Sequence, residues 1–254
     1  MSPHTTTRRP TAASKTLAEQ FQPIVTLHTS LRARGASHLD VDAARARIRA
    51  GRAAFDSGDV LRDAGDLTRA FQRTASALEH IGVASTPQAN ALQKASVDPT
   101  AHVLSWANGD SMPRSSHLKL ARQVAAIVGN AVLARASDQI VDGFSLANWK
   151  RAQCPCCGAS PDLALSTDRR RTLVCWRCDT MWRTDRRGCL SCGADSAPTL
   201  ARVPSPQLGY ELAICNSCGR YLKERRGAPA NALLVERALT AGLDEAAQQR
   251  GLRA

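Results

Sequence analysis

Eight of the nine cysteines in this chain form four Cys-x-x-Cys pairs, all between Cys154 and Cys218. Each pair places two thiols on one tight turn, which is the arrangement that a tetrahedral site with soft ligands requires. Eight thiols at this spacing predict two metal sites with four thiolate ligands each. The predicted ligands are Cys154, Cys157, Cys175 and Cys178 in the first site, and Cys189, Cys192, Cys215 and Cys218 in the second.

An internal repeat supports this assignment of ligands. Segments 154–182 and 189–221 share one pattern. Each begins with a Cys-x-x-Cys pair, continues through a short strand, a turn and another strand into a second pair, and ends with hydrophobic and aromatic residues. Glycine follows three of the four pairs, where a positive φ lets backbone amides turn toward the sulfurs. The ninth cysteine, Cys156, lies inside the first pair, and we expect it to point away from the metal.

The predicted sites favour a structural or binding role over catalysis. Four protein thiolates leave no open position on the metal, so neither Lewis-acid catalysis nor activation of a bound water is expected. The sequence also has no phosphate-binding loop, no nucleophile elbow and no His-Glu-x-x-His motif, and all six histidines precede Cys154. We therefore expect a protein that is not an enzyme and has no small-molecule substrate. Its metal is iron or zinc, and intrinsic affinity favours zinc.

The composition of the whole chain, with 43% hydrophobic but only 4% aromatic residues, is typical of a largely helical protein. Apolar residues recur at helical spacing, and four to six helices are expected before Cys154. Pro23 should interrupt the first, Asp40 and Asp59 should cap the next two, and Asn108-Gly109-Asp110 should end a short helix. The predicted fold is α+β, with these parts: a disordered N-terminus at 1–13, a helical domain at 14–148, tandem rubredoxin-like or zinc-ribbon modules at 149–186 and 187–228, and a C-terminal helix within 229–254.

The sequence predicts a soluble, cytoplasmic protein. No apolar run approaches the roughly 20 residues that cross a bilayer, and the best candidate, 124–136, contains Gly129, Asn130 and Arg135. Arg8-Arg9 is not followed by an apolar segment, so neither a secretory nor a twin-arginine signal is predicted. In a reducing compartment, paired cysteines indicate metal ligands rather than disulfides.

Two other functions fit part of this pattern. The net charge of +12 and the arginine runs 169–171, 186–187 and 225–226 suggest a nucleic-acid-binding zinc ribbon. Only two tyrosines are present to stack on bases, so solvated arginines at hairpin tips explain the runs better and nucleic acid is an unlikely partner. A rubredoxin-like electron-transfer protein is the second alternative, with Trp176 and Trp182 near the first site, although packing against a small metal-bound fold explains these rings better.

The cysteine region resembles the FdhE family, the accessory proteins for formation of formate dehydrogenase. The resemblance covers roughly the last hundred residues, whereas residues 1–140 match only in being helical. It implies a cytoplasmic, rubredoxin-like iron protein that binds the catalytic subunit of a molybdenum- or tungsten-dependent formate dehydrogenase and is required for its activity. The motifs that carry it are the four Cys-x-x-Cys pairs, Trp149, Trp182 and Tyr221-Leu222-Lys223.

The ribbons also suggest a surface for that partner. The Tyr-Leu-Lys strand carries an aromatic ring and a charge that the metal site does not need, and aromatic and basic residues are common at protein interfaces. We expect the partner to bind an exposed ribbon face that includes Arg183, Arg187, Tyr221 and Lys223.

Overall fold

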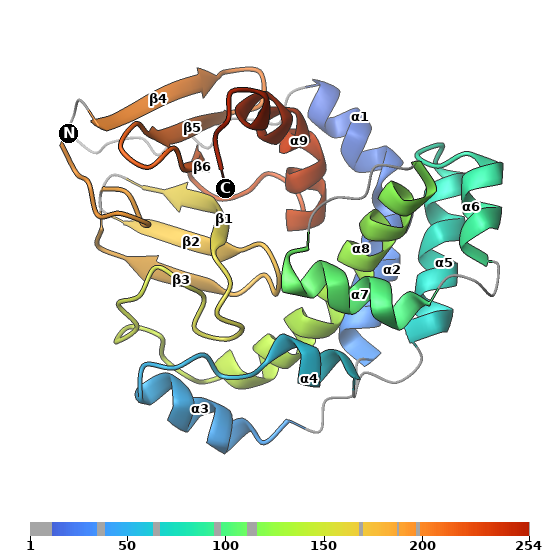
Figure 1. The fold of residues 1–254 in the computed structure, drawn as a ribbon, viewed down its shortest axis with the longest axis horizontal. Coiled ribbons are helices and arrows are strands. Elements are labelled where there is room, and N and C mark those ends of the chain that lie inside the picture. The colour runs from blue at the N-terminus through green and yellow to red at the C-terminus, as the bar shows by residue number, and fades with distance from the viewer. Residues whose placement is uncertain are drawn as a thin grey trace.

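The computed structural model describes residues 12–34, 39–62, 67–93, 98–110, 116–167, 170–186, 188–196 and 199–253. Within these ranges, eight helices precede a six-stranded sheet and a ninth helix follows it (Figure 1). The expected four to six helices are therefore too few. Of the predicted disordered segment 1–13, residues 1–11 lie outside the described ranges, and the first helix begins at Ala12.

The first three helices begin and end close to the predicted break at Pro23 and the predicted cap at Asp40. Helices α1 (Ala12–Gln20) and α2 (Gln22–Arg34) are separated at Phe21. Pro23 thus lies in the first turn of α2, where its missing N–H removes no helical hydrogen bond. Helix α3 (Val41–Arg49) is capped by the Asp40 side chain, which accepts a hydrogen bond from the Ala43 amide.

The next helices correct one predicted cap and confirm one predicted end. Asp56, rather than Asp59, caps the fourth helix, because its carboxylate accepts hydrogen bonds from the Gly58 and Asp59 amides. The helix that Asp59 was expected to cap is instead two helices, which the structure describes at 57–62 and 67–80. Gly109 adopts φ +79° and ends the seventh helix, as predicted from the segment Asn108-Gly109-Asp110. These helices are α4 (Ser57–Arg62), α5 (Leu67–His80), α6 (Thr86–Gln93) and α7 (Pro99–Asn108).

Helix α8 (Ser116–Val141) forms the centre of the helical domain. It contacts each of the helices α2 to α7, and its apolar residues are buried on several sides. Among the residues that the structure describes, it is the one helix long and apolar enough to cross a membrane, but 72% of its most apolar window is buried inside the fold. This burial is what the central helix of a folded domain requires.

The two predicted ribbons join into one sheet with the strand order β3-β2-β1-β6-β5-β4. Each ribbon is antiparallel, and β1 pairs with β6 in parallel where they meet. Both ribbons therefore contribute three strands in the same order, and the sequence repeat predicted the first two strands of each. The strands are β1 (Pro161–Ser166), β2 (Arg171–Cys175), β3 (Met181–Thr184), β4 (Leu200–Ser205), β5 (Tyr210–Cys215) and β6 (Tyr221–Arg226).

Helices cover parts of both faces of this sheet. Helix α9 (Leu233–Gln249) packs on one face, where its Leu233 and Leu243 contact a cluster that includes Leu163 and Tyr210. On the other face, Ala164, Leu173 and other side chains of the first ribbon join the core of the helical domain. The first ribbon therefore lies between α9 and the helical domain, which explains why adjacent residues of β1 are both buried.

Candidate metal centres

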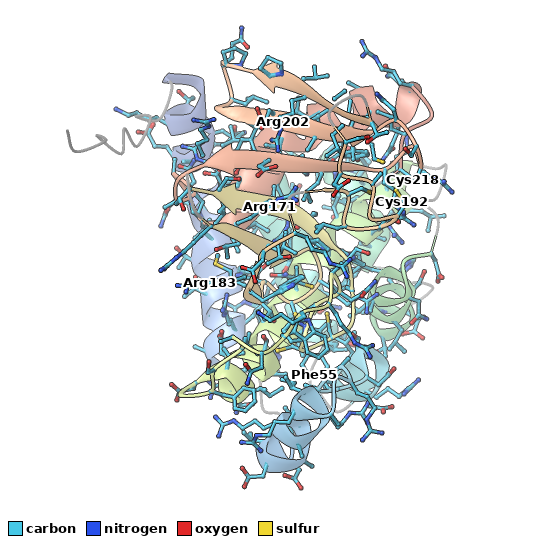
Figure 2. All side chains as sticks on the ribbon, turned by 90° about the vertical axis from the view of Figure 1, so that its left-hand side faces the viewer. Phe55, Arg171, Arg183, Cys192, Arg202 and Cys218 are labelled. Carbon is cyan, nitrogen blue, oxygen red and sulfur yellow. The ribbon has the colours of Figure 1, made fainter. Side chains whose placement is uncertain are left out.

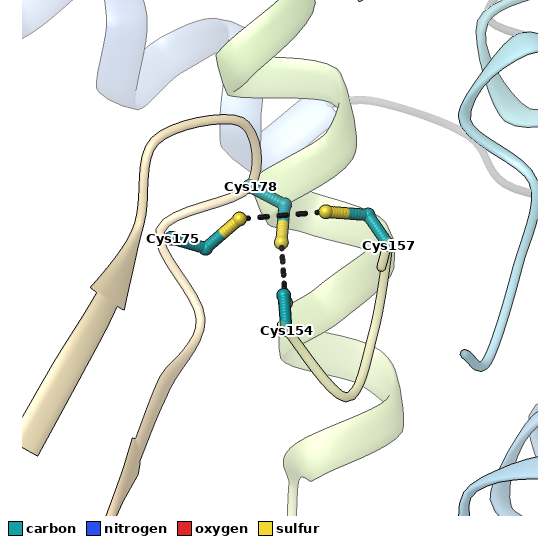
Figure 3. A group of neighbouring side chains, drawn as sticks. All are labelled: Cys154, Cys157, Cys175 and Cys178. Atoms are coloured by element: carbon teal, nitrogen blue, oxygen red, sulfur yellow. Dashed lines mark hydrogen bonds between the residues drawn. The ribbon is translucent and has the colours of Figure 1, made fainter. Parts of the chain in front are cut away.

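The first predicted ligand set comes together in the structure. The Sγ atoms of Cys154 and Cys178 lie 3.5 Å apart, and those of Cys157 and Cys175 lie 3.4 Å apart. Figure 3 shows the four side chains converging on one point. A tetrahedron with zinc–sulfur bonds of about 2.3 Å has sulfur–sulfur edges of about 3.8 Å, close to these distances. The cluster therefore has the donor set and the size to hold one zinc or iron ion.

The second ligand set has the same arrangement. The Sγ atoms of Cys189 and Cys218 lie 3.6 Å apart, as do those of Cys192 and Cys215. In each cluster all four sulfurs lie within 4.8 Å of one another. In both centres the first cysteine of one pair is nearest to the second cysteine of the other. Cys156 belongs to neither cluster, and its carbonyl instead accepts a hydrogen bond from the Phe55 amide.

All four pairs share one backbone turn. The residue after each pair has a positive φ, and its amide donates a hydrogen bond to the carbonyl of the first cysteine of that pair. Amides within these turns also point at sulfur, since Arg177 N lies 3.4 Å from Cys175 Sγ and Ser191 N lies 3.4 Å from Cys189 Sγ. Such donors stabilise a thiolate over a thiol. The residues with positive φ are Gly158, Asp179, Gly193 and Gly219.

Asp179 is a functional residue that sequence reasoning missed. It occupies the position held by glycine in the other three turns, with φ +57°. Its carboxylate accepts hydrogen bonds from Asn130 on α8 at 3.0 Å and from Arg237 on α9 at 2.7 Å. The departure from glycine was visible in the sequence and indicated a side chain with its own partners. Next to it, the Thr180 hydroxyl lies 2.9 Å from Cys178 Sγ.

Basic side chains offset the charge of the first centre. A divalent metal with four thiolates carries two net negative charges. The Arg237 guanidinium donates to the Cys175 carbonyl at 2.8 Å, and the Arg177 guanidinium donates to the Cys157 carbonyl at 3.4 Å. Both groups therefore place positive charge next to ligand residues.

Burial also affects the thiols of the first centre before metal binds. It raises the pKa of the Cys154 and Cys175 thiols well above the ordinary value. These thiols therefore carry protons at neutral pH when no metal is bound. Metal binding must displace those protons, so the affinity of this centre for metal rises with pH.

The second centre lies near the surface. Cys192 is exposed and Cys218 is partly exposed, and Figure 2 shows the two side by side at one end of the second ribbon. The C-terminal segment supports this centre, because the Arg253 amide donates to the Gly219 carbonyl at 2.8 Å. Cys189 and Cys215 also line a cavity of about 160 Å³ between the two ribbons.

The structure separates the residues of the predicted partner surface. Arg183 is exposed on the edge strand β3 (Figure 2), whereas Arg187 lies outside the described residues. Tyr221 and Lys223 are only 6% and 3% exposed, so the prediction that they form an exposed face is wrong. Alternate residues of β6 face α9, and there the Tyr221 hydroxyl and the Lys223 ammonium both bind Asp244.

Comparisons with known proteins agree in sequence and in fold. No family model matches the chain. A protein named "Protein FdhE homolog" from Shewanella baltica is 30% identical over 78 residues, 29% of this chain and 26% of that protein. Its namesake from Shewanella oneidensis is 32% identical over 74 residues, 28% of this chain and 24% of that protein. The matches thus span about a quarter of the length of these relatives.

The fold comparison covers nearly the whole chain. The crystal structure of the FdhE protein from Pseudomonas aeruginosa superimposes with a TM-score of 0.70 over 94% of this chain and 91% of that protein. The two sequences are 17% identical, so this similarity establishes the shared fold. The sequence matches and the common fold together confirm that this chain resembles the FdhE family.

Proposed function

We propose that this chain is a cytoplasmic accessory protein for a molybdenum- or tungsten-dependent formate dehydrogenase. It binds the catalytic subunit of that enzyme during assembly or maturation and is required for its activity. The observation that supports this most is the presence of two sulfur-only centres on a fold shared with an FdhE protein. The rest of the proposal depends on the family resemblance.

The chemistry of the centres supports a role in binding rather than catalysis. Each cluster offers four protein ligands, which fill the coordination sphere of a tetrahedral ion and leave no position for a substrate. The bound metal, iron or zinc, would crosslink the two turns of each ribbon. The chain's own residues hold those turns in place through the shared backbone hydrogen bonds and through Asp179 and Arg237.

The two alternative functions have less support. Of the arginines proposed to contact phosphate, Arg171 is paired with Glu224, and Arg225 is buried against the Tyr210 ring. The tryptophans proposed for electron transfer pack as core residues, because Trp182 is 2% exposed and Trp176 meets Trp106 edge-on at 5.2 Å. Burial and packing thus account for these side chains without a nucleic acid or a redox partner.

One purification experiment tests the proposed partner and the metal content together. The tagged full-length chain is purified without oxygen from its native host, and the metal content and the co-purifying proteins are measured. We expect two ions per chain and the catalytic subunit of a formate dehydrogenase. Deletion of the gene should abolish formate dehydrogenase activity, and the intact gene should restore it. Unchanged activity after deletion, with no such subunit captured, would refute the proposal.

A surface variant tests where the partner binds. Arg183 is the one residue of the predicted surface that the structure describes as exposed. Arg183→Glu should weaken capture of the catalytic subunit, because interface arginines carry a large share of binding energy. Arg73→Glu is the matched control, since Arg73 is also exposed but lies on α5 in the helical domain. Equal capture by both variants would remove Arg183 from the binding surface while leaving the accessory role intact.

A further inference from the structure

The two four-cysteine centres differ sharply in how solvent reaches them. All four ligands of the first centre are at most 6% exposed, and they belong to the same apolar core as α8 and Trp106. In the second centre Cys192 is exposed and Cys218 is partly exposed, and none of its four cysteines belongs to an apolar cluster of the described residues. The repeated sequence therefore produces two different environments.

The first centre is also locked in place by the helical domain. The Ala54 and Phe55 amides donate to the carbonyls of Pro155 and Cys156, so the segment between α3 and α4 pairs with the first Cys-x-x-Cys turn. The second turn is held by Asn130 from α8, whose amide donates to the Arg177 carbonyl at 3.2 Å. Opening this centre requires the helical domain to separate from the sheet.

Among the residues that the structure describes, none from the helical domain covers the second centre in this way. Its ligand turns are held by strands of their own ribbon and by the C-terminal segment, through the pairing of Arg253 with Gly219 and Tyr221. Two of its ligands, Cys192 and Cys218, face solvent, whereas Cys189 and Cys215 are 9% and 2% exposed and line the 160 Å³ cavity. Local opening of a surface turn needs much less free energy than separation of two packed layers.

We propose that the second centre is an exchange site, which passes its metal ion to soluble thiol or chelating ligands, while the first centre retains its ion as a fixed part of the core. In this exchange the Cys192 and Cys218 thiolates leave the ion first. Donor atoms of the incoming ligand replace them, and the released thiolates take up protons from water. The metal keeps its oxidation state. The inference depends on metal binding by the two clusters and is independent of the formate dehydrogenase role.

Kinetics of metal release test this directly. The full-length chain is loaded with two equivalents of zinc and mixed with excess chelator in the presence of an indicator for zinc. We expect two phases of one equivalent each, with rates that differ by about a hundredfold or more, because global or sub-global opening is far rarer than local opening. Trapping with iodoacetamide during the fast phase should alkylate Cys192 and Cys218 before any ligand of the first centre.

A double variant tests whether the fast phase of zinc release comes from the second centre. Cys192→Ser combined with Cys218→Ser should bind one equivalent of zinc, lose the fast phase, and keep the slow phase and the helical circular dichroism of the parent protein. Cys156→Ser is the control, because Cys156 lies outside both clusters, and it should keep both phases. Release of both ions at one rate, or earlier alkylation of Cys154, Cys157, Cys175 or Cys178, would overturn the proposal.

Discussion

The Asn130 side-chain amide donates a hydrogen bond to the Asp179 carboxylate over 3.0 Å, and it links the middle of α8 to the turn that follows Cys178. The same carboxylate binds Arg237 on α9, whose guanidinium also pairs with Asp162 at the start of the sheet. The helical domain, the turn after Cys178 in the first metal centre and the C-terminal helix therefore meet at Asp179. This residue holds together parts of the chain that are distant in sequence.

Replacement of Asp179 should loosen that junction. Asp179→Asn keeps a side chain that tolerates a positive φ but removes the buried charge opposite the partly buried Arg237. Because Arg237 keeps its ion pair with Asp162, the cost is that of a lost charged hydrogen bond, about 2 kcal/mol, rather than that of a buried charge left unpaired. We expect the free energy of unfolding in urea, at a fixed free zinc concentration, to fall by about that amount. Asp59→Asn, at an exposed pair with Arg62, should have almost no effect.

Lys223 should stabilise the attachment of α9 rather than contact a partner. Its ammonium lies 2.6 Å from Asp244 on α9, and its side chain is 4% exposed. Lys223→Met should lower the free energy of unfolding by about 2 kcal/mol, because it leaves Asp244 with one donor fewer. Adding Asp244→Leu should recover part of this loss in a double-mutant cycle.

That result bears on how a partner surface is tested. Lys223→Glu would place two carboxylates together beneath α9, and the resulting damage to the fold would resemble a loss of partner binding. Charge reversal at Arg183 avoids this problem because Arg183 makes no ion pair among the described residues. If Lys223→Met unfolded like the parent protein but bound the catalytic subunit more weakly, the structural role given to Lys223 would be wrong.

Local sequence signals predicted the metal centres and much of the fold. The four Cys-x-x-Cys pairs, with glycine after three of them, defined turns whose geometry depends on neighbouring residues alone. Asp40 and Gly109 marked helix ends for the same reason, since caps act within one turn of helix. The antiparallel hairpin between the two Cys-x-x-Cys pairs of each ribbon followed from the repeat.

Contacts between distant segments were beyond such signals. The parallel pairing of β1 with β6 joins the two ribbons, and no local pattern distinguishes it from two separate hairpins. The burial of Tyr221 and Lys223 depends on α9, which follows them in the chain. The difference in exposure between the centres likewise arises because, among the described residues, the helical domain covers the cysteines of the first ribbon and none of those of the second.

His28 should make stability depend on pH. Asn130 uses its amide group as a donor to Asp179, so its oxygen faces His28 and accepts from Nε2 at 2.7 Å. Burial lowers the pKa of His28, although Asn130 and the nearby Asp179 oppose that shift and Arg32 and Arg237 favour it. The unfolded chain therefore binds a proton at higher pH than the folded chain does. Below about pH 6.5, stability should fall by up to about 1.4 kcal/mol per pH unit, until the folded histidine also titrates.

The His28→Gln variant isolates this contribution. Both proteins carry the same cysteine centres, so acid-driven metal loss affects both and cancels in their difference. The measurement is the free energy of unfolding in urea at intervals between pH 7.5 and pH 5.5, with zinc held constant. We expect the stability of the parent protein to fall relative to that of the variant as the pH decreases. A constant difference across this range would mean that His28 does not change its protonation on unfolding.

Two helical glycines should respond to alanine in opposite directions. A Cβ atom on Gly129 of α8 would lie 2.4 Å from a ring carbon of Trp106, so the bulky ring would have to move within the core. Such overpacking typically costs 1 to 3 kcal/mol, and we expect a cost of about 2 kcal/mol here.

A Cβ on Gly242 of α9 would meet no atom within 4 Å, and alanine there should stabilise the protein by about 0.5 to 1 kcal/mol through its helix propensity. Thermal unfolding of the two zinc-loaded variants should therefore shift to lower temperature for Gly129→Ala and to higher temperature for Gly242→Ala. The same chemical change is made in both helices. If both variants unfolded at a higher temperature than the parent protein, the close contact between α8 and α7 at Trp106 would not limit the size of residue 129.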